Sequence, residues 1–362
     1  MSGFVIAIEF ILILSLLAFL HELGHFIPAR LFKIEVEEFG LGFPPRLVKL
    51  FTWKGTEFTL NWIPFGAFVR PKGENDPNIP GGLASANPFA RLVVLFGGPV
   101  MNLLVGALIF ALLFAQTGMP VANIVNIMEI APGSPAELAG MQKGDTLLAI
   151  NGQAIDSTAK LSTLVQQNLG KEITLSLKRG EQTLEVKATP RVKPPEGQGA
   201  LGIVMGNPSR SISYLEALPY GIEVTATQGM EMLRLPVRLI RGEIAGDQAR
   251  LVSPVGLGEI YGQARERDQQ DAAAGAPATS RNLRVIQLIA FISVALGITN
   301  LLPIPALDGG RILFVLFEIV LRRRVPAERE NMVHAIGFTL LILLMSYVLI
   351  QDIINPIPNL IP

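Results

Sequence analysis

Four long runs of apolar residues constrain this chain more than any other feature of its sequence. They cover residues 4–29, 89–116, 283–303 and 333–353. A helix needs about 20 apolar residues to cross a bilayer, so each run is long enough to do so. Half of the 362 residues are hydrophobic and only 17% are charged, which agrees with this view. The sequence predicts a polytopic α-helical membrane protein with about four transmembrane helices and smaller inserts between them.

Lysine and arginine are distributed unevenly around these runs. None precedes Arg30, whereas the first connection carries eight of them and the connection at 322–329 carries four. Because positively charged connections tend to remain in the cytoplasm, both are expected there. The N-terminus, the segment between the second and third runs, and the C-terminus are then expected on the other side of the membrane.

The motif His21-Glu22-Leu23-Gly24-His25 closes the first apolar run. Residues four apart share one face of a helix, so His21 and His25 can offer ring nitrogens to a single zinc ion. Glu22 lies beside them and can act as the general base toward water on that metal. Ionisable side chains are costly inside a membrane and are therefore functional by default. The motif predicts a hydrolytic zinc site at membrane depth.

A catalytic zinc site usually has three protein ligands, so a third ligand must come from elsewhere. Asp308 is the candidate, because it follows the third apolar run in a segment that Pro303 and Pro305 prevent from being a regular helix. By itself, Asp308 could equally cap the helix expected at 312–321. That run could also extend the third crossing or form a separate short helix.

Two motifs, at 21–25 and 300–311, together closely resemble the site-2 protease family of intramembrane zinc metalloproteases. Residues 96–102 (FGGPVMN) resemble the second-helix motif of that family, and residues 63–69 (IPFGAFV) resemble its membrane-associated β-hairpin. The resemblance covers most of the chain and implies a bacterial inner or cell membrane location.

The resemblance also implies roles for individual residues. Zinc would be bound by His21, His25 and Asp308, with Glu22 as the catalytic base. Asn102 and Asn300 would lie near the substrate or the developing oxyanion. From the residues alone, an asparagine in an apolar helix can equally hydrogen-bond a neighbouring helix.

The first connection contains two segments with strand character, at 36–43 and 57–69, which are rich in aromatic and β-branched residues and punctuated by Gly and Pro. We expect a hairpin at the membrane face. In the family such a sheet is thought to pair with an extended substrate, and an exposed strand edge suits that task. A hairpin that only shields the site is the alternative.

The segment between the second and third runs contains short alternating strands separated by turn signals, over residues 121–205. Residues 131–152 resemble a PDZ domain of the bacterial, circularly permuted type, in a single copy. Leu201, Gly202 and Ile203 resemble the loop whose amides receive the carboxylate of a peptide C-terminus. A steric gate that excludes bulky substrates, without binding a peptide, is the competing interpretation.

After this domain, residues 211–242 have the spacing of an amphipathic helix on the membrane surface. Residues 262–282 are rich in Ala, Gln, Asp and Arg, and predict a solvated linker. His334 opens the fourth run, and we expect an interfacial histidine there without a role at the metal. The chain has no cysteine, so it contains no disulfide, and no basic run indicates nucleic-acid binding.

The predicted organisation comprises a first transmembrane helix (1–35), a cytoplasmic-side hairpin region (36–87), a second transmembrane helix (88–118), an extracytoplasmic PDZ-like α+β domain (119–207), a membrane-surface helix with a linker (208–282), a third transmembrane helix with the LDG motif (283–325), and a fourth with the C-terminus (326–362). The expected function is that of an intramembrane zinc metalloendopeptidase. Its partners would be the lipid bilayer and transmembrane substrates, such as membrane-anchored regulators or signal-peptide remnants. The alternative is a catalytically silent scaffold that binds partners through the PDZ-like domain.

Overall fold

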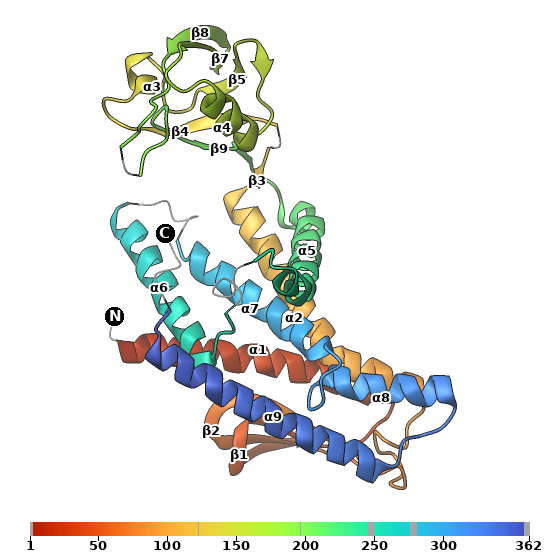
Figure 1. The fold of residues 1–362 in the computed structure, drawn as a ribbon. Coiled ribbons are helices and arrows are strands. Elements are labelled where there is room, and N and C mark those ends of the chain that lie inside the picture. The colour runs from red at the N-terminus through yellow and green to blue at the C-terminus, as the bar shows by residue number, and fades with distance from the viewer. Residues whose placement is uncertain (1–2, 122, 196, 245–249, 276–280, 358–362) are drawn as a thin grey trace. The chain divides into compact units, whose positions relative to one another are not determined.

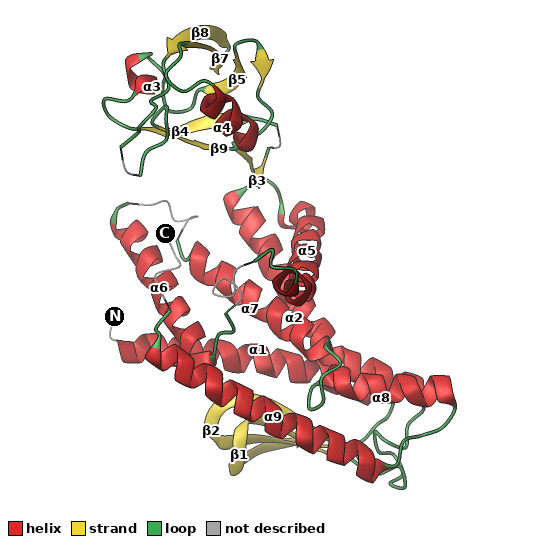
Figure 2. Cartoon of the chain, in the orientation of Figure 1, coloured by secondary structure: helices red, strands yellow, loops and turns green. Residues whose placement is uncertain are grey.

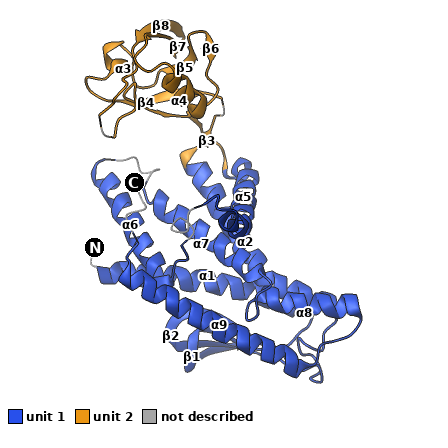
Figure 3. Cartoon of the chain, viewed as in Figure 1, with its two compact units in different colours: residues 1–116, 214–362 blue, residues 117–213 orange. Residues whose placement is uncertain are grey.

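The computed structural model describes residues 3–121, 123–195, 197–244, 250–275 and 281–357. The chain divides into two compact units (Figure 3). The first, here called the membrane unit, comprises residues 1–116 and 214–362, and the second, the inserted unit, comprises residues 117–213. Helices dominate the membrane unit, whereas strands dominate the inserted unit (Figure 2). The predicted C-terminal segment 326–362 is described only to residue 357.

Four of the described helices are long and apolar enough to cross a membrane, as the sequence predicted. They are α1 (Gly3–Leu31), α2 (Pro88–Thr117), α7 (Leu283–Leu301) and α9 (Ala327–Ile354) (Figure 1). Helices α1 and α2 approach closely where Gly24 faces Gly97, because a Cβ on either residue would collide with the backbone carbonyl of the other. These two glycines therefore set the spacing of the helices that frame the candidate site.

The predicted hairpin is confirmed and is longer than expected, with β1 at Val36–Trp53 and β2 at Thr56–Pro71. Residues 38–41 of β1 pair with residues 57–60 on one side and with residues 67–70 on the other. The last part of β2 is thus an edge of this folded-over sheet. A cluster that includes Phe26 and Phe39 packs the hairpin against α1.

Helix α5 (Tyr214–Ile240) occupies the segment predicted as an amphipathic helix. It buries a row of small residues, and this row fits against the membrane-spanning helices. A Cβ at Gly221 would meet Ala107 and Ala111 of α2, and one at Gly229 would meet Ile298 of α7. Close packing of small residues is a common way for helices to associate in membranes.

The prediction of a solvated linker at 262–282 was wrong over most of its length. Helix α6 (Pro254–Ala273) covers it up to Ala273, while residues 276–280 lie outside the described residues. Tyr261 and Ala264 are buried, and the ring of Tyr261 lies 5.4 Å from that of Phe10 on α1. One face of α6 thus packs within the membrane unit, so the segment up to Ala273 is not a free linker.

Pairing between helices explains how so polar a segment can be buried. Arg265 of α6 forms an ion pair with Glu9 of α1 at 3.3 Å. Asp268, whose side chain is fully buried, accepts a hydrogen bond from the backbone N–H of Val285 and pairs with Arg284 at 3.3 Å, both at the start of α7. Buried charges are tolerated when they are paired and hydrogen-bonded in this way.

The third crossing ends at Leu301, and a separate helix, α8 (Asp308–Leu321), follows after six residues that include Pro303 and Pro305. The run at 312–321 therefore belongs to a second, shorter helix. An ion pair of 2.6 Å between Arg91 of α2 and Glu318 of α8, in which the arginine is buried, ties α8 to α2.

The inserted unit has strands where the sequence predicted them. Its elements are β3 (Met119–Pro120), β4 (Val125–Ile130), α3 (Pro135–Leu138), β5 (Thr146–Ile150), β6 (Gln153–Ala154), α4 (Thr158–Gln167), β7 (Ile173–Arg179), β8 (Gln182–Ala188), β9 (Ile203–Gly206) and β10 (Ser209–Arg210). The main sheet has the order β8-β7-β5-β4-β9, with β6 on β5. Its apolar face packs against α4 around Leu161, Leu147 and Leu175. Strands β3 and β10 pair with each other at the two ends of the unit.

Candidate metal centre

The structure brings together the three residues that the sequence proposed as metal ligands. His21 and His25 lie on successive turns of α1, and Asp308 is the first residue of α8. His21 Nε2 is 3.1 Å from His25 Nε2, and Asp308 Oδ2 is 3.2 Å from the first and 3.4 Å from the second. They form a cluster of potential ligand atoms in the described part of the chain.

These distances fit a tetrahedral zinc ion. Ligands bound to zinc at about 2.1 Å lie about 3.4 Å from one another at the corners of a tetrahedron. Asp308 Oδ2 is buried and makes no hydrogen bond within the described residues. An orphaned carboxylate oxygen between two imidazole nitrogens is costly unless a cation satisfies it. Two imidazoles and a carboxylate are a donor set that catalytic zinc sites use.

A hydrogen bond fixes which nitrogen His25 presents to the cluster. His25 Nδ1 lies 2.8 Å from the backbone carbonyl of Val94 on α2, and only a ring N–H can donate to a carbonyl. The proton is therefore on Nδ1, and the lone pair of Nε2 is free. Partners of this kind orient metal-binding histidines and raise their basicity.

Asn102 plays the corresponding part for His21. Its amide Nδ2 lies 3.1 Å from His21 Nδ1, while its Oδ1 is buried without a partner among the described residues. A half-turn of the amide exchanges the two atoms and lets Oδ1 accept the Nδ1–H of the ring. That orientation satisfies Oδ1 and leaves His21 Nε2 free to bind a metal.

Gly98 makes room for both rings. A Cβ at this position of α2 would lie 2.7 Å from His21 Nε2 and still nearer to His25 Nε2. Gly98 and Asn102 are four residues apart and share a face of α2. The motif at 96–102 thus consists of a helix contact at Gly97, a space at Gly98 and a hydrogen-bond acceptor for His21 at Asn102.

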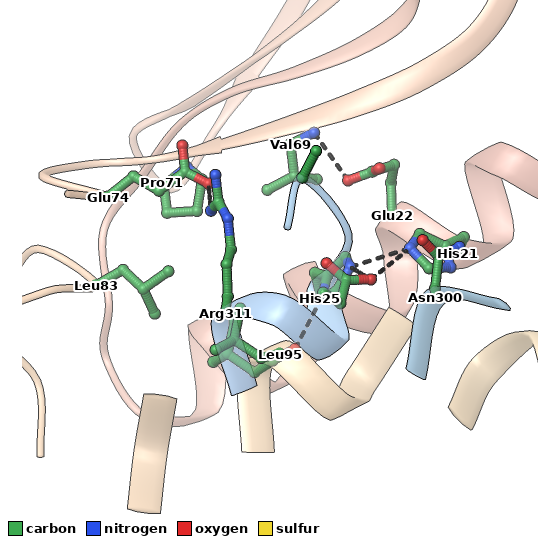
Figure 4. Close-up of a pocket in the computed structure, with 13 residues that line it drawn as sticks. His21, Glu22, His25, Val69, Pro71, Glu74, Leu83, Leu95, Asn300 and Arg311 are labelled. Atoms are coloured by element: carbon green, nitrogen blue, oxygen red, sulfur yellow. Dashed lines mark hydrogen bonds and ion pairs between the residues drawn. The ribbon is translucent and has the colours of Figure 1, made fainter. Parts of the chain in front are cut away.

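Glu22 faces the hairpin. Its Oε2 accepts a hydrogen bond of 3.0 Å from the backbone N–H of Val69, in the edge segment of β2 (Figure 4). This N–H points away from β1 and toward the site. This contact is not visible in the sequence, because a backbone amide leaves no signal in the side-chain pattern.

A cavity of about 280 Å³ opens over these groups. Its lining includes the candidate ligands, Glu22 and Asn300 (Figure 4). Asn300 donates one amide hydrogen to the carbonyl of Leu296 at 3.0 Å, on its own helix. Asn102 is 1% exposed and does not line the cavity, since it lies behind His21. Of the two asparagines, only Asn300 lines the cavity.

Two charged residues that the sequence analysis did not single out also line the cavity. Arg311, one turn beyond Asp308 on α8, forms an ion pair with Glu74, which follows the edge of β2 (Figure 4). Both side chains are about one-third exposed. The pair connects the helix that carries Asp308 to the end of the edge strand.

His334 is of intermediate burial and is hydrogen-bonded to the chain just before Asp308. Its Nδ1 accepts a hydrogen bond of 3.0 Å from the backbone N–H of Ala306, and its Nε2 is buried. Ala306 lines the cavity, two residues before Asp308. The side chain therefore contacts the segment that presents the third candidate ligand.

In the inserted unit, the predicted peptide-binding loop is partly engaged by its own backbone. Leu201 is buried and its carbonyl accepts the N–H of Ala136, while the N–H of Gly202 donates to the carbonyl of Gly199. Ile203 begins β9, which pairs with β4 on one side and, in the main sheet of the described residues, has no strand on the other. Peptide capture and steric gating both remain predictions.

The proteins that this chain resembles in sequence are consistent with a zinc site at these residues. A family profile described as peptidase family M50 matches residues 9–344. A protein of Clostridium acetobutylicum, named as a proposed zinc metalloprotease, is 30% identical over 361 residues and covers 99% of each chain. Relatives with the same description occur in Clostridium perfringens, at 33% identity over 96% of this chain and 98% of the relative, and in Campylobacter jejuni, at 30% identity over 96% and 94%.

The solved structures that resemble part of this chain include two crystal structures of PDZ domains of SdrC-like proteins. The one from Listeria monocytogenes is 18% identical, covers 24% of this chain and 92% of its own, and has a TM-score of 0.21. The one from Listeria innocua is 19% identical, covers 23% and 92%, and has the same TM-score.

Proposed function

This chain belongs to peptidase family M50 and is a zinc metalloprotease, and four of its described helices are long and apolar enough to cross a membrane; we propose that it cleaves transmembrane segments of membrane-anchored proteins. One observation carries this proposal. The cluster of His21, His25 and Asp308 lies on the apolar helix α1 and on α8, directly beside Glu22 and an open strand edge. A site so placed suits a substrate that reaches it from within the bilayer.

We assign His21, His25 and Asp308 to binding of zinc. When bound, zinc supplies Lewis acidity toward a peptide carbonyl and lowers the pKa of water at the site to about 7. Val94 and Asn102 hold the two rings so that each turns Nε2 toward the cluster. Asn300, whose Nδ2 has a second hydrogen to donate, is assigned to the oxyanion that develops on the carbonyl.

Glu22 moves the proton in this proposal. Its carboxylate accepts a proton from the attacking water and returns it to the peptide nitrogen as the C–N bond breaks. The amide of Val69 holds the carboxylate in place through Oε2, which leaves Oε1 for the water. Glu22 thus serves first as base and then as acid, and it is a carboxylate again when the peptide bond is broken.

The edge of β2 is proposed to bind the substrate backbone. A transmembrane helix keeps its peptide bonds in internal hydrogen bonds, so it must unwind before water can attack. Residues 67–71 pair with β1 on one side, and their other side faces the site. An edge of this kind can replace the lost hydrogen bonds by pairing with an extended segment.

Location and substrates follow as further parts of the proposal. The lysine and arginine bias supports a cytoplasmic position for the hairpin region and an extracytoplasmic position for the inserted unit, in a bacterial cell membrane. The inserted unit would then meet the outer part of a substrate first, as a gate or as a peptide-binding site. Membrane-anchored regulators and signal-peptide remnants are both suitable substrates.

The proposal is tested by cleavage of a reporter transmembrane helix in liposomes. The full chain and Glu22→Gln are compared at equal zinc content, measured by elemental analysis. We expect the variant to retain zinc and to lose cleavage by at least about 100-fold, the scale of a general base. Glu9→Gln is the matched control, because it makes the same change on α1 at a residue that pairs with Arg265 and Tyr261 instead.

Cleavage by Glu22→Gln at the wild-type rate would remove Glu22 from the mechanism. If the wild-type chain binds zinc and the reporter but cuts none of a panel of transmembrane helices, while it still cuts soluble peptides, the proposed substrate class is wrong.

A further inference from the structure

The segment that presents Asp308 has an unusual backbone. Between α7 and α8, Ala306 adopts a φ of +79°, in the left-handed region that residues with a Cβ rarely occupy. Such a conformation has to be held by its surroundings. Asp308 follows two residues later, and Leu307, which precedes α8, provides no side-chain cap for the helix. Local backbone hydrogen bonds, such as that from the N–H of Leu307 to the carbonyl of Ile304, hold the segment, but no side-chain cap fixes the start of α8.

Helix α9 supplies the missing support. The N–H of Ala306 donates to His334 Nδ1 at 3.0 Å. One turn further along α9, Gly337 is buried against Pro305, and a Cβ there would collide with that proline. The same face of α9 thus touches two consecutive residues of the segment.

His334 also contacts α8. Its ring lies 5.5 Å from the ring of Phe314, measured between centroids. One side chain therefore joins α9, the segment before Asp308 and α8 itself. Because Nδ1 accepts a hydrogen bond, the proton of the neutral ring is on Nε2.

We infer that His334 is a positioning residue for the metal site, which holds Ala306 in its left-handed conformation and so sets the place of Asp308 Oδ2. This inference rests on the proposed role of Asp308 as a zinc ligand. His334 does not belong to the ligand cluster, which contains His21, His25 and Asp308. It acts through the backbone, two residues away from the carboxylate.

The test measures zinc affinity of the full chain in detergent, by competition with a chromophoric chelator. Asparagine places its Oδ1 close to the position of His Nδ1 and keeps the acceptor, whereas glutamine places its oxygen near Nε2 and leucine has none. We expect His334→Leu and His334→Gln to weaken zinc binding by roughly 10-fold to 100-fold, as other losses of support around metal ligands do. His334→Asn should bind zinc close to the wild-type affinity.

A second variant separates positioning from general loss of fold. Glycine adopts a positive φ without strain, so Ala306→Gly combined with His334→Leu should recover part of the lost zinc affinity. Wild-type affinity in His334→Leu would overturn the inference. An affinity of His334→Asn as low as that of His334→Leu would overturn it as well, since the acceptor would then be irrelevant.

Asp308→Asn distinguishes this inference from its premise. If that variant binds zinc as tightly as the wild type, the ligand assignment fails, and the positioning role of His334 fails with it. If Asp308→Asn loses zinc while the His334 variants keep it, only the inference about His334 is wrong.

Discussion

At the scale of single residues, the site depends on a missing side chain as much as on those present. His21 and His25 can converge because Gly98 of α2 leaves space for both rings. Nothing in the spacing of the motif at 21–25 indicates this need, since the two segments are more than 70 residues apart. The sequence shows which groups can bind a metal, and the packing of α2 decides whether they meet.

Gly98→Ala tests this point. The new Cβ would overlap both imidazoles, so we expect zinc affinity to fall by about 10-fold or more. Zinc content after dialysis against a chelator is the measurement. Gly258→Ala on α6 is the control, because its Cβ would make an ordinary contact of 3.5 Å with Phe10. Equal zinc retention in both variants would contradict the packing argument.

The other residues show where prediction from sequence stops. His21, Glu22, His25 and Asp308 were identified because imidazoles and carboxylates are conspicuous in apolar segments, and the structure brings all four together. The contact of Glu22 with Val69 could not be predicted, because it uses a backbone amide. His334 was judged by its position in the fourth run, and its contact with Ala306 depends on a break between two other helices.

At the scale of elements, hydropathy predicted the membrane-spanning helices and failed for α6. The four spans are apolar by themselves, so a local average finds them. Two charged residues of α6 have partners on other helices, since Arg265 pairs with Glu9 of α1 and Asp268 pairs with Arg284 of α7. When a segment is considered by itself, such charged residues are predicted to be exposed to solvent.

The ion pair between Arg311 and Glu74 links two elements that must act together. It joins α8, which carries Asp308, to the chain just after the edge of β2. Exposed pairs contribute about 1 kcal/mol or less, so Glu74→Gln and Arg311→Gln should each lower the cleavage rate by about fivefold at most. The charge-swapped double variant, Glu74→Arg with Arg311→Glu, should recover most of the rate.

The pair Lys72–Glu35 provides the control for this experiment. It involves the same segment, at 2.8 Å, but neither residue lines the cavity. Glu35→Gln should therefore leave cleavage unchanged. No recovery in the charge-swapped variant, or an equal loss in Glu35→Gln, would show that the Arg311–Glu74 pair has no specific role.

At the scale of the whole molecule, the inserted unit has a core of its own, and its stability is expected to depend on acid through one buried ion pair. In the inserted unit, Asp145 is 1% exposed and forms two hydrogen bonds with Arg179, at 2.7 and 2.8 Å. Burial alone would raise the pKa of Asp145, but the hydrogen bonds from Arg179 and from the backbone of Gln142 outweigh it, so the pKa lies below its usual value. The charged form therefore stabilises this unit.

A lowered pKa in the folded state determines the sign of the pH effect. The stabilisation is complete above about pH 4, the range of an unperturbed aspartate, and is lost as the pH falls further. We expect the amides of residues 117–213 to lose protection from hydrogen exchange in this range, in the full chain. Asp145→Asn should destabilise the unit by about 2 kcal/mol at pH 7 and reduce the acid dependence.

Asp156→Asn is the control for this prediction. The Asp156 carboxylate is more than half exposed and pairs with Lys160 at 3.4 Å, so its loss should change protection little. Wild-type protection in Asp145→Asn at pH 7 would show that the Asp145–Arg179 pair does not stabilise the unit.

The pairing of β3 with β10 bears on how the inserted unit can change in evolution. Pro120 pairs with Ser209 and Met119 with Arg210, so the chain enters and leaves the inserted unit at neighbouring points. The residues between these two strands can be lengthened, duplicated or exchanged while the two ends of the unit stay side by side. The connections to α2 and α5 then need not change. The inserted unit can therefore be replaced as a whole while the residues of the metal site stay unchanged.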